Sequence, residues 1–289
     1  MIRSIGKRSL TLLAFLSGLA ACSSTADKHL NALSLSQEPL LGKFVWHDLI
    51  TDDIAATEKF YGALFGWTFQ NTTRPNGGDY TLIMADGLLI GGIVRVDEPA
   101  NLNYSRWLGY LSVQNVDDAA READAAGGAI LTGPLELGNI GRAAAIRDPQ
   151  GAVVGLLRSR HGDPDDSATQ APGHIVWNEL LAEDDVAASS FYTALTGLQA
   201  EGRSRRGGEY TILMAGDKER AGIQPRPAEE VEPLWLTYFA VTDPVAAAAR
   251  VAALGGEVLL PPSEDLREGT MAVVIDPNGA LLALQKLAD

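Results

Sequence analysis

Cysteine is almost absent from this chain of 289 residues, with Cys22 as the only one. An intrachain disulfide is therefore excluded even in an oxidising compartment, and so is a zinc site built from spaced cysteines. The sequence also lacks a phosphate-binding glycine loop, a dinucleotide-binding fingerprint and a serine nucleophile elbow. These absences argue against the common nucleotide-dependent enzymes and serine hydrolases.

Positive charge is also scarce. The chain has 23 basic and 37 acidic residues, and three of the basic residues but none of the acids lie in the first 21 positions. The net charge is −14 overall and −17 for the part after position 21, a sign that repels phosphate backbones and anionic membrane surfaces. We therefore expect no nucleic-acid partner. With 46% hydrophobic and 21% charged residues, the composition is that of a globular protein.

The N-terminus has the pattern of an export signal. Basic residues at positions 3, 7 and 8 precede an apolar run from Leu10 to Ala21, which is too short for a membrane-spanning helix. The run ends in Leu-Ala-Ala-Cys and resembles the bacterial lipobox, whose cysteine becomes the lipidated first residue. We expect a signal peptide over residues 1–21, lipidation of Cys22 and a tether over residues 22–41. The mature protein would be an exported lipoprotein at the periplasmic or outer-membrane side, in contact with the membrane through its lipid anchor alone.

An internal repeat organises the rest of the chain. Residues 44–66 and 175–197 align without a gap at a spacing of 131, and ten of the 23 positions are identical. The match resumes further on, up to an Asp-Pro-x-Gly turn that begins at Asp148 in one copy and at Asp276 in the other. The chain is therefore a duplication, for which we expect domains at 42–159 and 174–289 and a linker at 160–173.

Each copy has the pattern strand, helix and three strands, repeated once. In the first copy an apolar strand over 44–49 precedes a helix that Thr51 or Asp52 can cap and that Gly66 ends. Strands at 80–85, 90–96 and 106–113, a second helix at 116–126 and a closing hairpin follow. This order predicts a mixed α/β fold with a largely antiparallel sheet.

These residues carry a family resemblance. The Trp46-His47-Asp48-Leu49 segment, the Phe60-Tyr61 pair that follows Asp53, and the closing Asp-Pro-x-Gly turn resemble the vicinal-oxygen-chelate superfamily. That superfamily includes glyoxalases, extradiol dioxygenases, fosfomycin-resistance enzymes and bleomycin-binding proteins. The resemblance implies tandem glyoxalase-like domains, each of paired βαβββ modules that form a curved mixed sheet.

The resemblance also implies where metal ligands would lie, on the first, fourth, fifth and eighth strands of a domain. The corresponding positions here are Trp46, Gly92, Leu108 and Gly155 in the first copy and Trp177, Gly222, Leu236 and Ala283 in the second. None of these side chains offers the carboxylate or imidazole that a divalent metal needs. We therefore expect neither a metal nor a cofactor.

His47 lies next to the first-strand ligand position, and Asn178 takes its place in the second copy. Strand alternation sends Trp46 and Asp48 to one face and His47 to the other. A metal or catalytic role for His47 therefore remains the alternative to a polar residue bonded beneath the helix.

The same alternation puts an acid beside each repeated tryptophan on the concave side of the sheet, with a tyrosine pointing inward from the fifth strand. Aromatic walls with a few polar groups are typical of small-molecule pockets, although tryptophans in the core and acids bonded at strand ends would give the same pattern. The six candidate ligand-binding residues are Trp46, Asp48, Tyr110, Trp177, Glu179 and Tyr238.

The leading hypothesis is an envelope-anchored protein that binds a small, partly apolar molecule without a metal. We expect a monomer with an internal pseudo-dimer, whose pocket draws on both copies. One alternative is a lyase or dioxygenase-type enzyme with a displaced metal at His47 and Asp48, or with carboxylates as acid and base. The other is a structural or interaction lipoprotein with an inactive pocket.

Overall fold

The computed structural model describes residues 33–73, 79–96, 105–138, 140–166, 170–205 and 208–287. The expected signal peptide and Cys22 lie outside these ranges. Within them, no helix has both the length and the hydropathy needed to span a bilayer.

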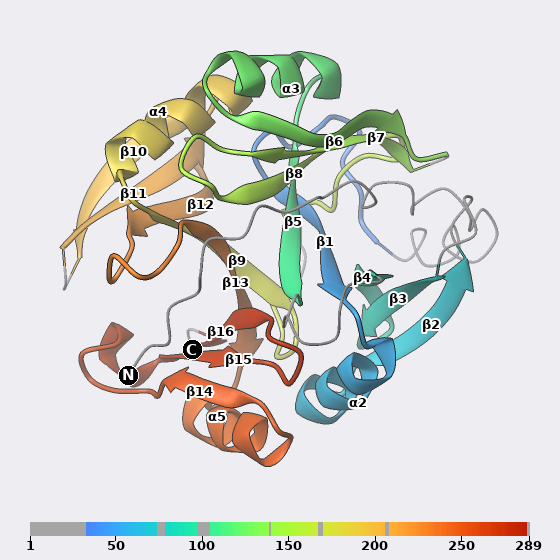
Figure 1. The fold of residues 1–289 in the computed structure, drawn as a ribbon, viewed down its shortest axis with the longest axis vertical. Helices are drawn as coiled ribbons and strands as arrows, with labels where there is room; N and C mark the ends of the chain where they lie inside the picture. Colours follow the sequence, from blue (N-terminus) through green and yellow to red (C-terminus); the bar gives the residue numbers. More distant parts are fainter. Residues whose placement is uncertain are drawn as a thin grey trace.

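The first copy folds into eight strands and two helices, shown from blue to yellow-green in Figure 1. Its elements are β1 (Phe44–Thr51), α2 (Ile54–Phe65), β2 (Thr68–Thr73), β3 (Asp79–Ala85), β4 (Leu88–Arg95), β5 (Arg106–Ser112), α3 (Val116–Ala125), β6 (Ala129–Glu136), β7 (Gly141–Arg147) and β8 (Val153–Ser159).

The second copy repeats this order. Its elements are β9 (Ile175–Ala182), α4 (Asp185–Thr196), β10 (Gln199–Arg205), β11 (Gly208–Ala215), β12 (Lys218–Pro225), β13 (Leu234–Val241), α5 (Pro244–Ala253), β14 (Glu257–Leu260), the short helix η1 (Arg267–Gly269), β15 (Met271–Ile275) and β16 (Leu281–Lys286).

Each copy forms its own eight-stranded sheet. The strand orders are β2-β3-β4-β1-β5-β8-β7-β6 and β10-β11-β12-β9-β13-β16-β15-β14. Parallel pairing occurs where β1 meets β4 and β5 meets β8, and at the equivalent places in the second sheet; the other pairings are antiparallel. The expected mixed, largely antiparallel α/β fold of tandem paired modules is confirmed.

The first helix of each copy shows how local sequence sets the boundaries. Asp53 caps α2 by accepting a hydrogen bond from the Ala56 backbone nitrogen at 2.9 Å, and Gly66 ends it in the left-handed conformation. The prediction that Thr51 or Asp52 would be the cap was wrong. Thr51 is the last residue of β1, and its hydroxyl instead accepts from the Asp53 backbone nitrogen at 3.2 Å.

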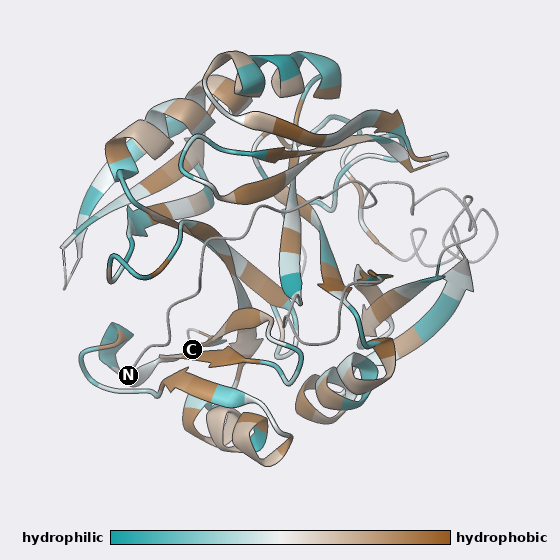
Figure 2. Ribbon diagram, in the orientation of Figure 1, coloured by the Kyte–Doolittle hydropathy of each residue, from teal (hydrophilic) through white to brown (hydrophobic). Residues whose placement is uncertain are grey.

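The two sheets pack through their helix-covered faces. Helix α2 lies beside α5 of the other copy, and α3 lies beside α4 (Figure 1). Two large hydrophobic clusters join the copies there, one containing Phe60 and Phe239 and the other containing Leu156 and Tyr192. Figure 2 shows hydrophilic residues along α3 on the outside and hydrophobic segments on the strands beneath it. The concave faces, which carry no helices, therefore point away from each other.

The expectation that the candidate residues of both copies would line one shared pocket was consequently wrong. Sharing would require strands of the two copies to form one enclosing surface, but β1 pairs with β4 and β5 of its own copy. We call the concave face of the first sheet bowl 1 and that of the second sheet bowl 2.

The Asp-Pro-x-Gly turn of each copy binds the first helix of the other. Tyr192 donates to Asp148 Oδ2 at 2.9 Å, and Tyr61 donates to Asp276 Oδ2 at 3.1 Å. Each of these aspartates also accepts backbone hydrogen bonds within its own turn. The repeated Tyr and Asp of the sequence motif are thus interdomain contacts.

Residues 33–41, expected as part of a tether, lie against the linker between the copies. The Ser36 backbone nitrogen donates to Asp163 O at 2.8 Å, and Leu35 forms a bridge with Pro164. Lys43 Nζ donates to the Pro164 carbonyl at 2.6 Å. Leu33 also packs against the hydrophobic cluster of bowl 1.

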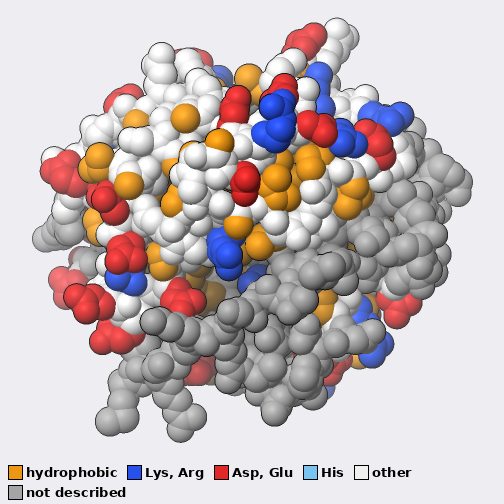
Figure 3. Space-filling model, turned by 45° about the horizontal axis from the view of Figure 1, so that its top comes forward, with side chains coloured by type: hydrophobic (Ala, Val, Ile, Leu, Met, Phe, Trp, Pro, Cys, Tyr) orange, Lys and Arg blue, Asp and Glu red, His pale blue; other side chains and the backbone are white. Residues whose placement is uncertain are grey.

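On the face shown in Figure 3, acidic side chains are scattered among basic and apolar ones.

Candidate functional site

Bowl 1 contains a carboxylate held by three aromatic side chains. Asp48 Oδ1 accepts from Tyr80 at 2.8 Å and from Trp46 Nε1 at 2.9 Å, and Asp48 Oδ2 accepts from Tyr110 at 2.9 Å. These residues come from β1, β3 and β5, whose side chains meet on the concave face. Burial and then the charge of Asp48 raise the pKa of both tyrosines well above that of a free phenol, so their hydroxyls remain donors.

Bowl 2 repeats the arrangement and adds a cation. Glu179 Oε1 accepts from Tyr238 at 2.5 Å, and Glu179 Oε2 accepts from Tyr210 at 2.7 Å. Trp177 Nε1 donates to the Tyr210 hydroxyl at 2.9 Å. Arg267 Nη2 lies 2.5 Å from Glu179 Oε2, and its side chain is 28% exposed. The carboxylate is therefore satisfied by two hydroxyls and a guanidinium.

The structure brings the six predicted residues together as two groups of three, one in each bowl. Asp48 is 1% exposed and Glu179 is fully buried, whereas Trp46 and Trp177 are partly exposed. A ligand in either bowl would therefore contact the tryptophans first. Each carboxylate accepts hydrogen bonds from two tyrosine hydroxyls and thereby fixes their orientation.

The sequence analysis missed Tyr80, Tyr210 and Arg267. The two tyrosines lie at equivalent positions in the repeat, next to an acid in each copy, so the alignment held a signal for them. Arg267 belongs to a loop between β14 and β15, where the first copy has a shorter connection between β6 and β7. No periodic pattern points to it.

The positions of the implied metal ligands do not fit a metal. A Cβ atom at Gly92 would lie 1.9 Å from the Tyr80 hydroxyl, and one at Gly155 would lie 2.1 Å from Tyr110 Cδ1. At Gly222 the corresponding distance to the Tyr210 hydroxyl is 1.8 Å. Tyrosine side chains thus fill the space that ligand side chains would need, and the described residues contain no group of three or more His, Cys, Asp or Glu side chains suited to a metal.

His47 lies on the opposite face of β1 from Asp48, at the contact between the copies. It is 4% exposed, and its Nε2 lies 3.0 Å from Oδ1 of Asn178, the equivalent residue of the second copy. The Thr237 hydroxyl donates to the same oxygen at 3.2 Å. Burial lowers the pKa of His47 to about 4, so at neutral pH the ring is uncharged and donates from Nε2. His47 therefore faces neither bowl.

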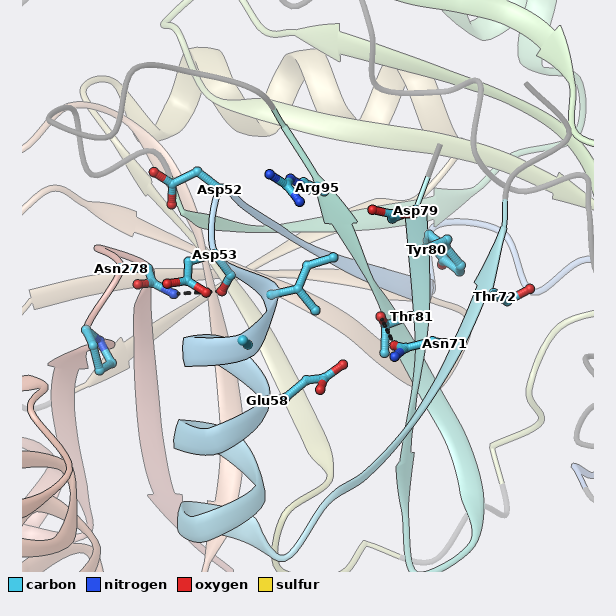
Figure 4. Close-up of a pocket in the computed structure, with 13 residues that line it drawn as sticks. Asp52, Asp53, Glu58, Asn71, Thr72, Asp79, Tyr80, Thr81, Arg95 and Asn278 are labelled. Atoms are coloured by element: carbon cyan, nitrogen blue, oxygen red, sulfur yellow. Dashed lines mark hydrogen bonds between the residues drawn. The ribbon is translucent and has the colours of Figure 1, made fainter. Parts of the chain in front are cut away.

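A separate cavity of about 810 Å³ lies between helix α2 and strands β2 and β3, and the Asp-Pro-x-Gly turn of the second copy contributes Pro277 and Asn278 to its lining (Figure 4). Burial raises the pKa of Glu58 in this cavity, and its Oε1 atom is buried without a hydrogen-bond partner. None of the six predicted residues lines the cavity, although Tyr80 of the Asp48 cluster does. Its lining residues are Asp52, Asp53, Ile54, Ala55, Glu58, Asn71, Thr72, Asp79, Tyr80, Thr81, Arg95, Pro277 and Asn278.

Known structures share this fold. LapB, a 2,3-dioxygenase from Pseudomonas sp. KL28, superposes with a TM-score of 0.57 at 12% identity, over 86% of this chain and 93% of its own. The manganese-bound glyoxalase from Novosphingobium aromaticivorans gives a TM-score of 0.55 at 16% identity, over 85% of this chain and 82% of its own. At these identities the likeness concerns the fold alone.

Sequence relatives are closer. "Putative glyoxylase CFP32" of Mycobacterium tuberculosis is 35% identical over 247 residues, which cover 84% of this chain and 94% of that protein. "Anthracycline biosynthesis protein DnrV" of Streptomyces peucetius is 31% identical over 261 residues, covering 86% and 94%. A family model described as the Glyoxalase/Bleomycin resistance protein/Dioxygenase superfamily matches residues 43–156 and 171–284. The chain therefore belongs to that superfamily, with one family domain in each copy.

Proposed function

We propose that this protein binds a small, partly apolar molecule in its bowls without using a metal. The observation that carries the proposal is the packing of Tyr80 against Gly92 and of Tyr110 against Gly155, because these rings fill positions where metal ligands would lie. In their place each bowl presents a partly exposed tryptophan backed by a hydrogen-bonded carboxylate. This combination suits an aromatic ligand body with a hydrogen-bond donor or a positive charge.

The name of one relative supports an aromatic ligand class. Anthracyclines are polycyclic aromatic compounds, and the Streptomyces relative is named for their biosynthesis. The enzyme alternative with a displaced metal has weaker support, because His47 and Asp48 lie on opposite faces of β1. Asp48 and Glu179 cannot act as one acid–base pair either, because they belong to separate sheets.

Metal content is the first measurement that tests the proposal. Protein purified without chelators is expected to contain far less than one transition-metal ion per chain, as measured by inductively coupled plasma mass spectrometry. Stoichiometric manganese, iron, nickel or zinc would contradict metal-independent binding.

Ligand binding is the second measurement. We expect aromatic compounds with an amine or hydroxyl donor to raise the melting temperature of the wild type, because a ligand of the folded state stabilises it. Asp48→Asn and Glu179→Gln should weaken this effect by releasing the tyrosines that support the tryptophans. Each of these changes should also lower the free energy of unfolding by about 1–3 kcal/mol, because one buried hydroxyl loses its acceptor.

The matched control is Asp118→Asn, which removes an exposed acid whose partner is Arg121 on helix α3. It should retain the wild-type response to ligand. Equal thermal shifts in the wild type and in the two bowl variants would remove both carboxylates from the ligand-binding role.

We also propose that the mature protein is anchored at the cell envelope through a lipid on Cys22. The support is the N-terminal sequence alone: a basic start, an apolar run and the Leu-Ala-Ala-Cys end. Cys22→Ala is expected to move the protein from the membrane fraction to the soluble fraction, as followed by fractionation and immunoblotting. A Cys22→Ala variant that still sediments with membranes would disprove the anchor, and Ser23→Ala is the matched control.

A further inference from the structure

The loop between β14 and β15 places a cation inside bowl 2. Arg267 Nη2 lies 2.5 Å from Glu179 Oε2 and 3.3 Å from the Tyr238 hydroxyl. Its Cζ atom lies 5.0 Å from the centre of the Tyr238 ring. A buried carboxylate combined with an aromatic face is a favourable environment for a guanidinium or ammonium group.

We call Glu179, Tyr210 and Tyr238 the cage, and their positions do not depend on the loop. Glu179, Tyr210 and Tyr238 come from β9, β11 and β13, which are strands of one continuous sheet. Their hydrogen bonds to one another, at 2.7 Å for Tyr210 and 2.5 Å for Tyr238, hold the carboxylate in place. The sheet therefore supplies a preformed anionic and aromatic receptor, and the loop supplies its cation.

Two features of the loop favour displacement of the Arg267 side chain from Glu179. Arg267 and Glu268 both have left-handed backbone angles, with φ of +50° and +57°, which cost free energy for residues other than glycine. Several of its backbone hydrogen bonds are internal, among them Gly269 N to Ser263 O at 2.8 Å and Leu266 N to Ser263 O at 2.9 Å. These bonds can persist while the Arg267 side chain turns outward, and this side chain, 28% exposed, already reaches solvent.

We infer that bowl 2 is a binding site for an organic cation with a guanidinium-like head, which displaces Arg267 from Glu179. Arg267 is then an internal competitor that keeps the buried carboxylate paired when no ligand is present. The inference names the ligand class of bowl 2 and rests on the proposed function only for the claim that the bowls receive external molecules.

The experiment uses ethylguanidinium as the probe and ethylurea as its uncharged analogue of similar shape. The proteins are the full-length wild type, Arg267→Ala, the Arg267→Ala/Glu179→Gln double variant and Arg121→Ala. The last removes an exposed arginine of helix α3 that is paired with Asp118, away from bowl 2. Binding is followed through the Trp177 indole signal in ¹H–¹⁵N spectra, because its N–H donates to Tyr210 of the cage.

Arg267→Ala should bind ethylguanidinium at one site per chain. The wild type should bind it roughly tenfold or more weakly, because only molecules with Arg267 displaced from Glu179 are competent. The double variant should lose the binding, Arg121→Ala should match the wild type, and ethylurea should bind to none of them. Should Arg267→Ala be unfolded alone, ethylguanidinium should restore its near-ultraviolet circular dichroism.

Three outcomes would overturn the inference: no binding or refolding of Arg267→Ala, binding that survives in the double variant, or wild-type binding as tight as that of Arg267→Ala. Failure of the proposed function is distinguishable from these outcomes. In that case no aromatic compound would raise the melting temperature of the wild type, while Arg267→Ala would still bind ethylguanidinium.

Discussion

Gly155→Ala is expected to lower the free energy of unfolding by about 3 kcal/mol or more, measured by urea denaturation. The added methyl group would lie 2.1 Å from Cδ1 and 2.5 Å from Cγ of Tyr110. Because these atoms are at the base of the ring and Tyr110 is 1% exposed, the whole side chain must move. Its hydrogen bond to the buried Asp48 carboxylate would be lost as well.

Gly202→Ala is the matched control for this experiment. Gly202 also lies in a strand, β10, but a Cβ atom there would have no heavy atom within 4 Å, and its φ is not in the left-handed region. The free energy of unfolding of Gly202→Ala should stay within about 0.5 kcal/mol of that of the wild type. If Gly155→Ala were as stable as Gly202→Ala, the Tyr110 ring would not occupy the position of the eighth-strand metal ligand.

Acidification is expected to destabilise the fold by about 3 kcal/mol through His47 alone. The pKa of this histidine falls from 6.5 to about 4 in the folded protein, mainly because of burial. The unfolded chain therefore binds a proton at a higher pH than the folded chain does. The stabilising contribution is complete above pH 6.5, and it is lost as the pH falls from there towards about 4.

The measurement is a series of urea denaturation curves across this pH range, compared with those of His47→Gln. Glutamine can donate to Asn178 but cannot take up a proton, so the variant should lose the histidine part of the pH dependence. His161→Gln replaces an exposed histidine of the linker and should behave as the wild type. Identical pH profiles for His47→Gln and the wild type would contradict the buried, neutral state of His47.

The fold was predictable because its signals are local or repeated. The helix-ending Gly66, the strand alternation around Asp48 and the matched motifs of the two copies all follow from short-range patterns. The alternation also separated His47 correctly from Trp46 and Asp48. Local patterns do not show which strands meet across the molecule. The candidate residues of both copies were therefore expected in one pocket, whereas the structure places them in two bowls.

The chemistry of the bowls was only partly predictable for the same reason. Strand periodicity places Asp48 and Tyr110 on one face but does not show that their hydrogen bonds satisfy each other and leave the carboxylate 1% exposed. Arg267 could not be identified, because it reaches Glu179 over 88 residues of sequence from an irregular loop. The cap at Asp53 was misplaced by one or two positions because three consecutive residues, Thr51 to Asp53, can all act as caps.

The paired contacts of Asp148 with Tyr192 and of Asp276 with Tyr61 make the interface between the copies isologous, since each side gives and receives the same kind of contact. A single copy carries both halves of that interface and could satisfy them only with a second molecule. In the fused chain the interface surface of each copy is covered by the other copy. The formation of this interface therefore no longer depends on protein concentration. The duplication thereby leaves the two bowls, which face outward, free to diverge in sequence without altering the contacts that hold the pair together.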